Sequence, residues 1–215
     1  MRIAVCISGH PRFYEKGFEY FKKNLIDVNQ SHQIDTFIHS WCSNLDEATA
    51  IDSLYKPKSC IFEPEKVVWS QNEHIHSNKI QYSMFYGMRM ALTQSFHQGY
   101  DLIIRYRFDA ALLKPVVIND VSEGLCVIDA INNPERYCDW MIFGKEKNMR
   151  HVADIYNELG ILEFSPFFGE EALFAKIKKE QLSVHKLYPN QQGENLVLIR
   201  GQDDGIRGWI NVKNL

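Results

Sequence analysis

Apolar runs alternate with segments of helical spacing along this chain, and this alternation predicts its secondary structure. The first run, Arg2–Ile7, is continuous and stops at a Ser8-Gly9 turn signal, which predicts a buried strand followed by a turn. Further strands are expected at Gln33–Ser40, Cys60–Phe62, Lys66–Trp69, Asp101–Arg107, Leu125–Asp129, Asp139–Phe143, around Val184 and at Leu196–Ile199. Helices are expected at Phe13–Val28, within Trp41–Leu54, and at Lys79–His97, Lys147–Leu159 and Gly169–Glu180.

The order of these elements predicts the fold class. Strands and helices alternate, at least in the first half, which favours an α/β fold of the Rossmann-like type, with one mostly parallel sheet and helices on both faces. Residues 70–78 are polar and are expected to form a loop, and the tail after Arg200 carries no clear pattern. A chain of 215 residues is best explained as one domain spanning residues 1–215.

Composition narrows the classes of partner. The net charge is −3 and there is no basic stripe, so we do not expect nucleic acid as a partner. The five cysteines form no C-x-x-C pair, which is more typical of reduced thiols in the cytoplasm than of a zinc ribbon or a disulfide framework. No apolar stretch approaches the length of a membrane span, so we expect at most peripheral membrane contact.

The first candidate site is the turn after the first strand, Ser8-Gly9-His10-Pro11-Arg12. In open α/β sheets, ligands bind outside the carboxyl ends of the strands, which is where this turn is expected. Gly9 allows a close approach of the backbone to a ligand, and Arg12 can pair with a phosphate. An ordinary strand-to-helix turn would have the same pattern.

The second candidate is Arg105-Tyr106-Arg107-Phe108-Asp109, at the end of the strand predicted at 101–107. Arg105 and Arg107 alternate along the strand and share one face, and Asp109 continues this alternation unless the strand bends first. Charged groups at the edge of a buried strand are unfavourable without a partner. A diphosphate with a divalent cation, Mg²⁺ or Mn²⁺ bound to Asp109, would satisfy them. A structural Arg–Asp ion pair is the alternative.

Three acidic residues in the second half are weaker candidates. Glu170 and Glu171 lie in the first turn of a predicted helix, where a favourable interaction with the helix dipole also explains them. Asp139 precedes a predicted strand, where a cap or turn role is common. No nucleophile elbow, Walker loop or complete dinucleotide fingerprint is present, which counts against esterases, kinases and dehydrogenases.

Six segments together resemble bacterial glycosyltransferase-like proteins of the GT-A type, including those associated with lipopolysaccharide and capsule synthesis. The segments span Arg2 to Leu173 and are I-A-V-C-I-S-G-H-P-R, D-T-F-I-H-S-W, Y-S-M-F-Y-G-M-R-M-A, Y-D-L-I-I-R-Y-R-F-D, D-W-M-I-F-G-K-E-K-N-M and G-E-E-A-L. Each segment is loose alone, and their order is more specific. The resemblance implies a GT-A-type sheet, with a donor half at about 1–115 and an acceptor half at about 116–215.

The resemblance also implies roles for the candidate residues. It implies that Ser8, Gly9 and Arg12 belong to the nucleotide pocket. It also implies that Arg105, Arg107 and Asp109 stand where such enzymes place their metal and diphosphate motif, with Asp109 as the metal ligand. Asp139 would face the acceptor, and Glu170 or Glu171 would be the base. Two departures are visible. Arg107 replaces the first aspartate of the metal motif, so the arginines take part of its role, and Gly169 stands where looser relatives have proline.

The expected function is transfer of a sugar from a nucleoside-diphosphate sugar to a glycan or lipid-linked hydroxyl, in the cytoplasm or at the inner face of the membrane. Inversion and retention at the anomeric carbon both stay open. On this hypothesis Asp109→Asn abolishes turnover and leaves the fold intact. Three alternatives are a catalytically inactive module that binds nucleotide-sugar, a nucleotidyltransferase of similar fold, and a structural partner whose sheet binds nothing.

Overall fold

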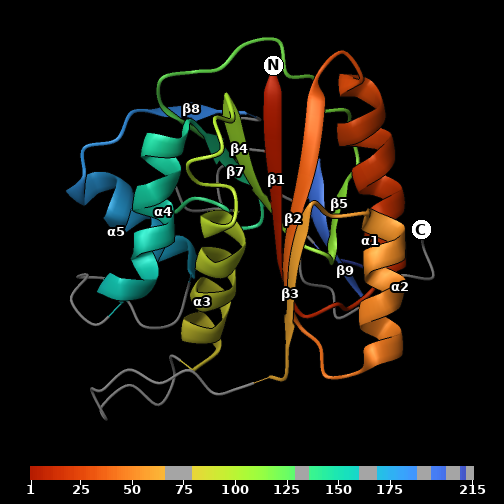
Figure 1. Cartoon of the computed structure of the whole chain (residues 1–215). Helices are drawn as coiled ribbons and strands as arrows, with labels where there is room; N and C mark the ends of the chain where they lie inside the picture. The colour runs from red at the N-terminus through yellow and green to blue at the C-terminus, as the bar shows by residue number, and fades with distance from the viewer. Residues whose placement is uncertain (66–78, 129–135, 160–168, 188–194, 202–208, 212–215) are drawn as a thin grey trace.

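The computed structural model describes residues 1–65, 79–128, 136–159, 169–187, 195–201 and 209–211. The strand expected at 66–69 and the loop expected at 70–78 lie outside the described residues. The described part has an α/β architecture, with a mixed, mostly parallel sheet between two groups of helices (Figure 1). The fold class predicted from the alternation of elements is therefore confirmed at this level.

The main sheet has seven strands in the order β3-β2-β1-β4-β7-β6-β8. Neighbours from β3 to β4 pair in parallel, β7 runs antiparallel to both β4 and β6, and β6 pairs in parallel with β8. The strands are β1 (Arg2–Gly9), β2 (Gln33–Trp41), β3 (Ser59–Glu63), β4 (Leu102–Tyr106), β6 (Leu125–Val127), β7 (Ile142–Gly144) and β8 (Val184–Lys186). β1 and β4 therefore lie side by side at the centre of the sheet.

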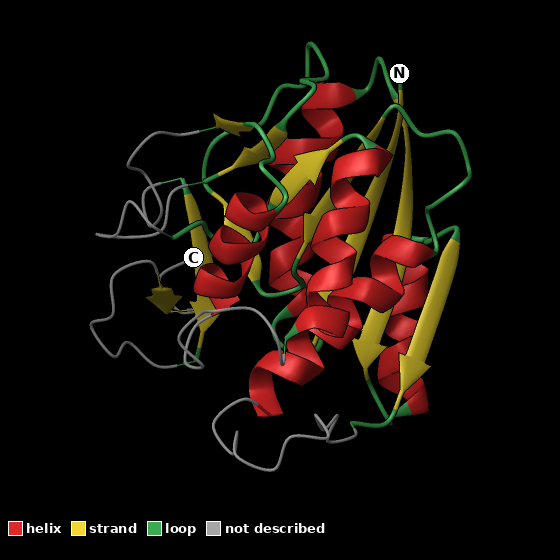
Figure 2. Cartoon of the chain, turned by 90° about the vertical axis from the view of Figure 1, so that its left-hand side faces the viewer, coloured by secondary structure: helices red, strands yellow, loops and turns green. Residues whose placement is uncertain are grey.

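The first strand separates two hydrophobic layers because it is apolar on both faces. Ile3 and Val5 pack in the cluster that contains residues of α1 (Tyr14–Phe21) and α2 (Leu45–Tyr55). Ala4 and Cys6 pack on the opposite face, in the cluster formed with α3 (Lys79–Thr93), α4 (Glu146–Glu158) and α5 (Gly169–Lys179). Figure 2 shows the second group of helices in front of the main sheet. Burial on both faces is what a central parallel strand requires.

The prediction of a single sheet was incomplete. A second sheet joins β10 (Trp209–Asn211), β9 (Leu196–Arg200) and β5 (Ala110–Leu112), with β5 and β9 antiparallel. β5 has only three residues and follows β4 after a short turn, so no apolar pattern separates it from β4 in the sequence. The pairings β4–β7 and β5–β9 join the halves 1–115 and 116–215 closely.

The remaining element boundaries follow local chemistry. The first predicted helix, 13–28, is an α-helix only to Phe21 and continues as a wider turn at Lys22–Ile26 and a tighter one at Asp27–Asn29. Asn44 caps α2 by accepting hydrogen bonds from the backbone of Asp46 and Glu47.

All five cysteines are free thiols. Among the described helices, none combines the length and apolar character of a membrane-spanning segment.

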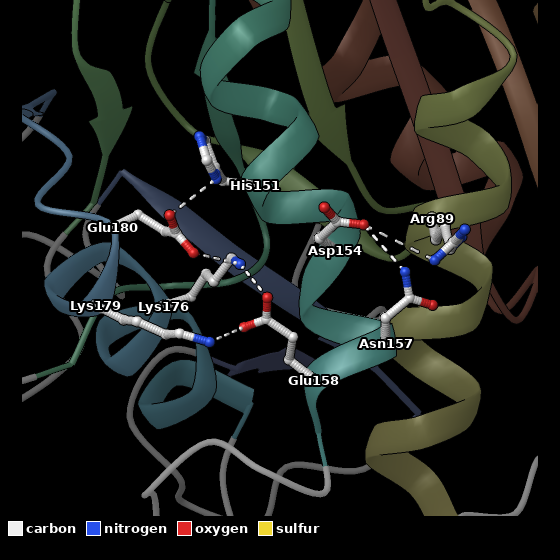
Figure 3. A network of polar contacts seen from close by, with 8 residues as sticks. All are labelled: Arg89, His151, Asp154, Asn157, Glu158, Lys176, Lys179 and Glu180. Carbon is white, nitrogen blue, oxygen red and sulfur yellow. Dashed lines mark hydrogen bonds and ion pairs between the residues drawn. The ribbon is translucent and has the colours of Figure 1, made fainter.

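A network of charges fixes α5 against α4 (Figure 3). The Lys176 side chain is only 2% exposed, and its ammonium donates to Glu158 of α4 at 2.7 Å and to Glu180 at 2.8 Å. Lys179 pairs with the other oxygen of Glu158 at 3.0 Å, and His151 lies 3.5 Å from Glu180. Because the network holds the carboxyl half of α5, it also sets the position of that helix's first turn.

Replacing Lys176 with alanine is expected to lower the free energy of unfolding by about 2 kcal/mol, because two charge-assisted hydrogen bonds are lost. The two carboxylates are 21% and 26% exposed, so water compensates them in part. Lys179→Ala is the matched control, since Lys179 is 48% exposed and should contribute at most about 1 kcal/mol. Urea unfolding of both variants measures the difference, and equal effects would show that burial of Lys176 does not matter.

Candidate functional site

The strand order places a ligand-binding edge between β1 and β4. After β1 the chain adds β2 and then β3 on one side of β1, and the connecting helices α1 and α2 cover one face of the sheet. The chain then returns through α3, which covers the other face, and places β4 on the opposite side of β1. Such a reversal of strand order opens a crevice at the carboxyl ends of the strands, and ligands of open α/β sheets bind there. The turns after Gly9 and Tyr106 both lie at this edge.

The turn after β1 contributes backbone and a buried hydroxyl. Ser8 is 2% exposed, and its Oγ has no hydrogen-bond partner among the described residues. Gly9 has a φ of 128°, which L side chains rarely adopt, and a Cβ built there would meet no described heavy atom within 4 Å. Open space beside Gly9 is therefore available to a ligand. Arg12 is exposed further along the turn.

The turn after β4 turns out to be the most charged part of this edge. β4 ends at Tyr106, and β5 then pairs with β9 in the second sheet. The Ile199 amide of β9 donates to the Asp109 carbonyl at 2.8 Å, which fixes the backbone of Asp109. The strand therefore bends before Asp109, and the simple alternation predicted for Asp109 does not apply. Instead, the bend folds the Asp109 side chain back onto Arg107.

Asp109 lies between two guanidinium groups. Arg107 donates from Nε to Oδ1 at 2.7 Å and from Nη2 to Oδ2 at 2.9 Å, a bidentate pair. Arg200 of β9 donates from Nη1 to Oδ2 at 2.7 Å, and also to the Ile199 carbonyl at 2.9 Å. The Asp109 side chain is 6% exposed, so the carboxylate is desolvated and compensated by both arginines. The structural Arg–Asp ion pair considered in the sequence is present.

The charges of this cluster shift one another's pKa values. Burial alone would raise the pKa of Asp109, but Arg107 and Arg200 outweigh it and lower this pKa to about 2. Burial would lower the pKa of Arg107, but the negative charge of Asp109 outweighs the effect of burial and raises this pKa above its ordinary value. Burial, with Arg107 next in importance, lowers the pKa of Arg105 to about 10. Arg105, Arg107 and Asp109 are therefore all charged at neutral pH.

Arg105 is the most deeply buried cation at this edge. It is 1% exposed, its Nη1 donates to the Trp140 carbonyl at 3.1 Å, and its Nε has no hydrogen-bond partner among the described residues. Side chains at alternate positions of β1 and β4 face α3, so Arg105 and Ser8 share one face of the sheet. Two buried polar groups with unused hydrogen-bonding capacity therefore lie on adjacent strands at the same edge.

The predicted acids come to this edge from two further elements. β7 runs antiparallel to β4, so Asp139, just before β7, lies at the carboxyl end of β4. Asp139 is 5% exposed and is among the charges that act on both Arg105 and Arg107. Its Oδ2 would lie 3.2 Å from a Cβ built on Gly169 at the start of α5. A larger residue than glycine would therefore crowd Asp139 here.

The two glutamates of α5 differ in their surroundings. Glu170 is half-buried and acts on the buried Cys138 together with Asp139 and Arg105, so it lies near the same charges. Glu171 instead forms an ion pair with Arg136, and its Oε2 is buried without a hydrogen-bond partner among the described residues. The structure therefore brings Glu170 into the cluster and holds Glu171 on a different partner.

A divalent cation does not fit the carboxylate at the centre of this cluster. Mg²⁺ and Mn²⁺ require several oxygen ligands, whereas the two oxygens of Asp109 accept three N–H donors from Arg107 and Arg200. In the described part of the chain, no group of three or more His, Cys, Asp or Glu side chains is arranged to hold a metal ion. The cation predicted at Asp109 stays a prediction.

Sequence reasoning missed Arg200 and Arg136, and it gave His10, which lies within the first candidate turn, no role of its own. Arg200 follows the apolar run Leu196–Ile199, the same signal that drew attention to Arg105, but it lies 91 positions from Asp109. His10 lies 3.3 Å from Glu65. Burial lowers the pKa of His10, and its other charged neighbours include those of the cluster. Only the position of β9 beside β5 reveals that Arg200 belongs to the site.

A scan against protein-family models finds no match for this chain, and a search of curated proteins finds no relative either. The resemblance to GT-A-type glycosyltransferases therefore stays a prediction drawn from the sequence. The fold, the strand reversal at β1 and the charged residues at this edge carry the functional argument on their own.

Proposed function

We propose that this protein transfers a sugar from a nucleoside-diphosphate sugar to a hydroxyl group of a glycan or lipid-linked acceptor. The observation that carries the proposal is the group of charges at the β1–β4 edge. Arg105, Arg107 and Arg200 supply cations at the sheet edge where β1 ends at Gly9, and carboxylates lie at the same edge. A diphosphate needs the cations, and proton removal from an acceptor needs a carboxylate.

The strand order supports a nucleotide as the ligand. The segment β3-β2-β1-β4 has the order found in Rossmann-type sheets, which bind nucleotides where the order reverses. Positive charge at that point suits a diphosphate better than a neutral metabolite. A role in surface-polysaccharide synthesis, in the cytoplasm or at the inner face of the membrane, is part of this proposal.

The reaction assigns each group one task. The acceptor oxygen forms a bond to the anomeric carbon, and the bond from that carbon to the diphosphate oxygen breaks with its electron pair on the diphosphate. The guanidinium groups stabilise the charge that builds on this leaving group. The acceptor proton goes to a carboxylate.

Among the acids, Glu170 is the best candidate for the base. It is half-buried, so an acceptor can reach it, and it begins the helix that faces Asp139. Asp139 is almost fully buried beside Arg105, where its charge compensates the arginines. Glu171 is held by Arg136. We therefore place Glu170 as the base and Asp139 as a positioning residue.

Thermal melting with UDP, GDP, dTDP and CMP, and with the corresponding nucleoside triphosphates, tests the nucleotide site. One of these nucleotides is expected to raise the melting temperature by several degrees, because a ligand at 100 times its Kd stabilises the folded state by about 2.7 kcal/mol. The matched nucleoside without phosphates is the control and should give no shift, since the cluster recognises phosphate.

Each result of this panel separates the candidate functions. A shift with one diphosphate, followed by slow release of free sugar from its sugar conjugate, supports the transferase. Binding without any turnover favours an inactive nucleotide-sugar-binding module, and a shift only with nucleoside triphosphates favours a nucleotidyltransferase. If no nucleotide changes the melting temperature, the proposed function is wrong.

A further inference from the structure

We infer that this protein holds the diphosphate of its nucleotide without a divalent cation, with the guanidinium groups of Arg105, Arg107 and Arg200 in the place of the metal. The inference rests on the proposed function, since it concerns how the same site binds the nucleotide. It differs from the metal site predicted at Asp109, because it makes Asp109 the residue that organises the cations.

The Asp109 carboxylate is already occupied by hydrogen-bond donors of the protein. Its two oxygens accept three hydrogen bonds of 2.7, 2.9 and 2.7 Å from two arginines. A carboxylate has about four lone-pair positions, so these three bonds leave at most one for a metal ion. Any further metal contact would displace a guanidinium and break a largely buried ion pair, which is strongly unfavourable. Two guanidiniums in contact with the carboxylate also repel an approaching dication.

Two buried polar groups deep in the site have unused hydrogen-bonding capacity. The Nε of Arg105 and the Oγ of Ser8 are both buried, and neither has a hydrogen-bond partner in the described part of the chain. A buried donor without a partner is unfavourable, and an anion or an anion-bound water would satisfy both groups. A metal ion would not satisfy the Nε of Arg105, because a guanidinium N–H donates a hydrogen bond and cannot act as a ligand.

The three arginines are held in fixed positions. Each arginine is fixed by a second contact: Arg105 by the Trp140 carbonyl at 3.1 Å, Arg200 by the Ile199 carbonyl at 2.9 Å, and Arg107 by its bidentate pair with Asp109. Fixed cations stabilise a developing charge without reorganising, which is also what a bound metal achieves. The three fixed guanidinium groups can therefore stabilise the charge of the diphosphate in place of a divalent cation.

Nucleotide affinity in EDTA and in Mn²⁺ tests the inference on the unmodified protein. Isothermal titration calorimetry with the nucleotide that raises the melting temperature should give Kd values within about twofold in the two buffers. Arg200→Met should weaken binding at least tenfold in EDTA, because one charge-assisted contact is worth about 1.5–3 kcal/mol. Arg200 is the best position to change, since Asp109 keeps its bidentate partner Arg107.

The control is Arg150→Ala, which removes the same charge from an exposed pair on α4 with Glu146 and should leave the Kd unchanged. Binding that requires Mn²⁺ would overturn the inference and keep the proposed function. Equal binding in both buffers with no effect of Arg200→Met would also overturn the inference, because the positive charge that holds the diphosphate would then not come from Arg200. Absence of nucleotide binding in either buffer would overturn the proposed function itself.

Discussion

Asp109→Ala is expected to lower the free energy of unfolding by about 3–5 kcal/mol, the cost of removing one partner from a buried ion pair. The carboxylate is 6% exposed and compensates Arg107 and Arg200, whose side chains are only 22% and 20% exposed. Without it, two partly buried cations repel each other at the junction of β4, β5 and β9. This expectation replaces the one drawn from the sequence, that removing this charge leaves the fold intact.

The same carboxylate gives the stability a defined dependence on pH. Its folded pKa is about 2, below the ordinary value of 3.8, so its contribution is complete above that ordinary value and is lost as the pH falls towards 2. The contribution amounts to roughly 2–3 kcal/mol. The difference in stability between wild type and Asp109→Ala should therefore shrink in acid, between about pH 5 and pH 2.

Urea unfolding at pH 7 and at pH 3 measures both effects. Asp27→Ala is the matched control, because Asp27 pairs with Lys22 on the surface, where the two side chains are 39% and 54% exposed. That variant should change stability by at most about 1 kcal/mol at either pH. A loss for Asp109→Ala as small as the loss for Asp27→Ala would contradict the buried ion-pair cluster.

Glu170→Gln is expected to reduce kcat by about 10²–10⁴, the usual contribution of a general base, with little change in nucleotide affinity. Glutamine keeps the shape of the side chain and cannot take the acceptor proton. Steady-state kinetics with the sugar conjugate of the nucleotide found by thermal melting measures kcat, and calorimetry measures the affinity. A separate effect on kcat is what distinguishes the base from a residue that only supports the fold.

Glu171→Gln is the matched control for this prediction. It makes the same change one position along the same helix turn, where the side chain is paired with Arg136, so we expect less than a tenfold loss of kcat. Should Glu171→Gln abolish turnover while Glu170→Gln remains active, the two roles are exchanged. Equal and small losses would leave neither glutamate as the base and would favour Asp139.

The amino-acid sequence alone determined the fold class and the edge of the sheet that carries the charges. The apolar runs Ile3–Ile7 and Leu102–Ile104 can be buried on both faces, which predicts central strands, and the structure confirms this. The positions of Gly9 and Arg105 relative to these strands followed directly, because side chains alternate along a strand and turns follow its end.

Only the tertiary structure decided how those charges are paired. The bend after Tyr106 sends β5 into a second sheet, and β9 then brings Arg200 to Asp109 from 91 positions away. The choice between Glu170 and Glu171 likewise depended on the position of α5, which is set by Arg136 and by the network around Lys176. Local patterns report burial and periodicity over a few residues, whereas ion pairs and bends depend on which distant segments pack together. That is why the sequence located the candidate site and the structure assigned its partners.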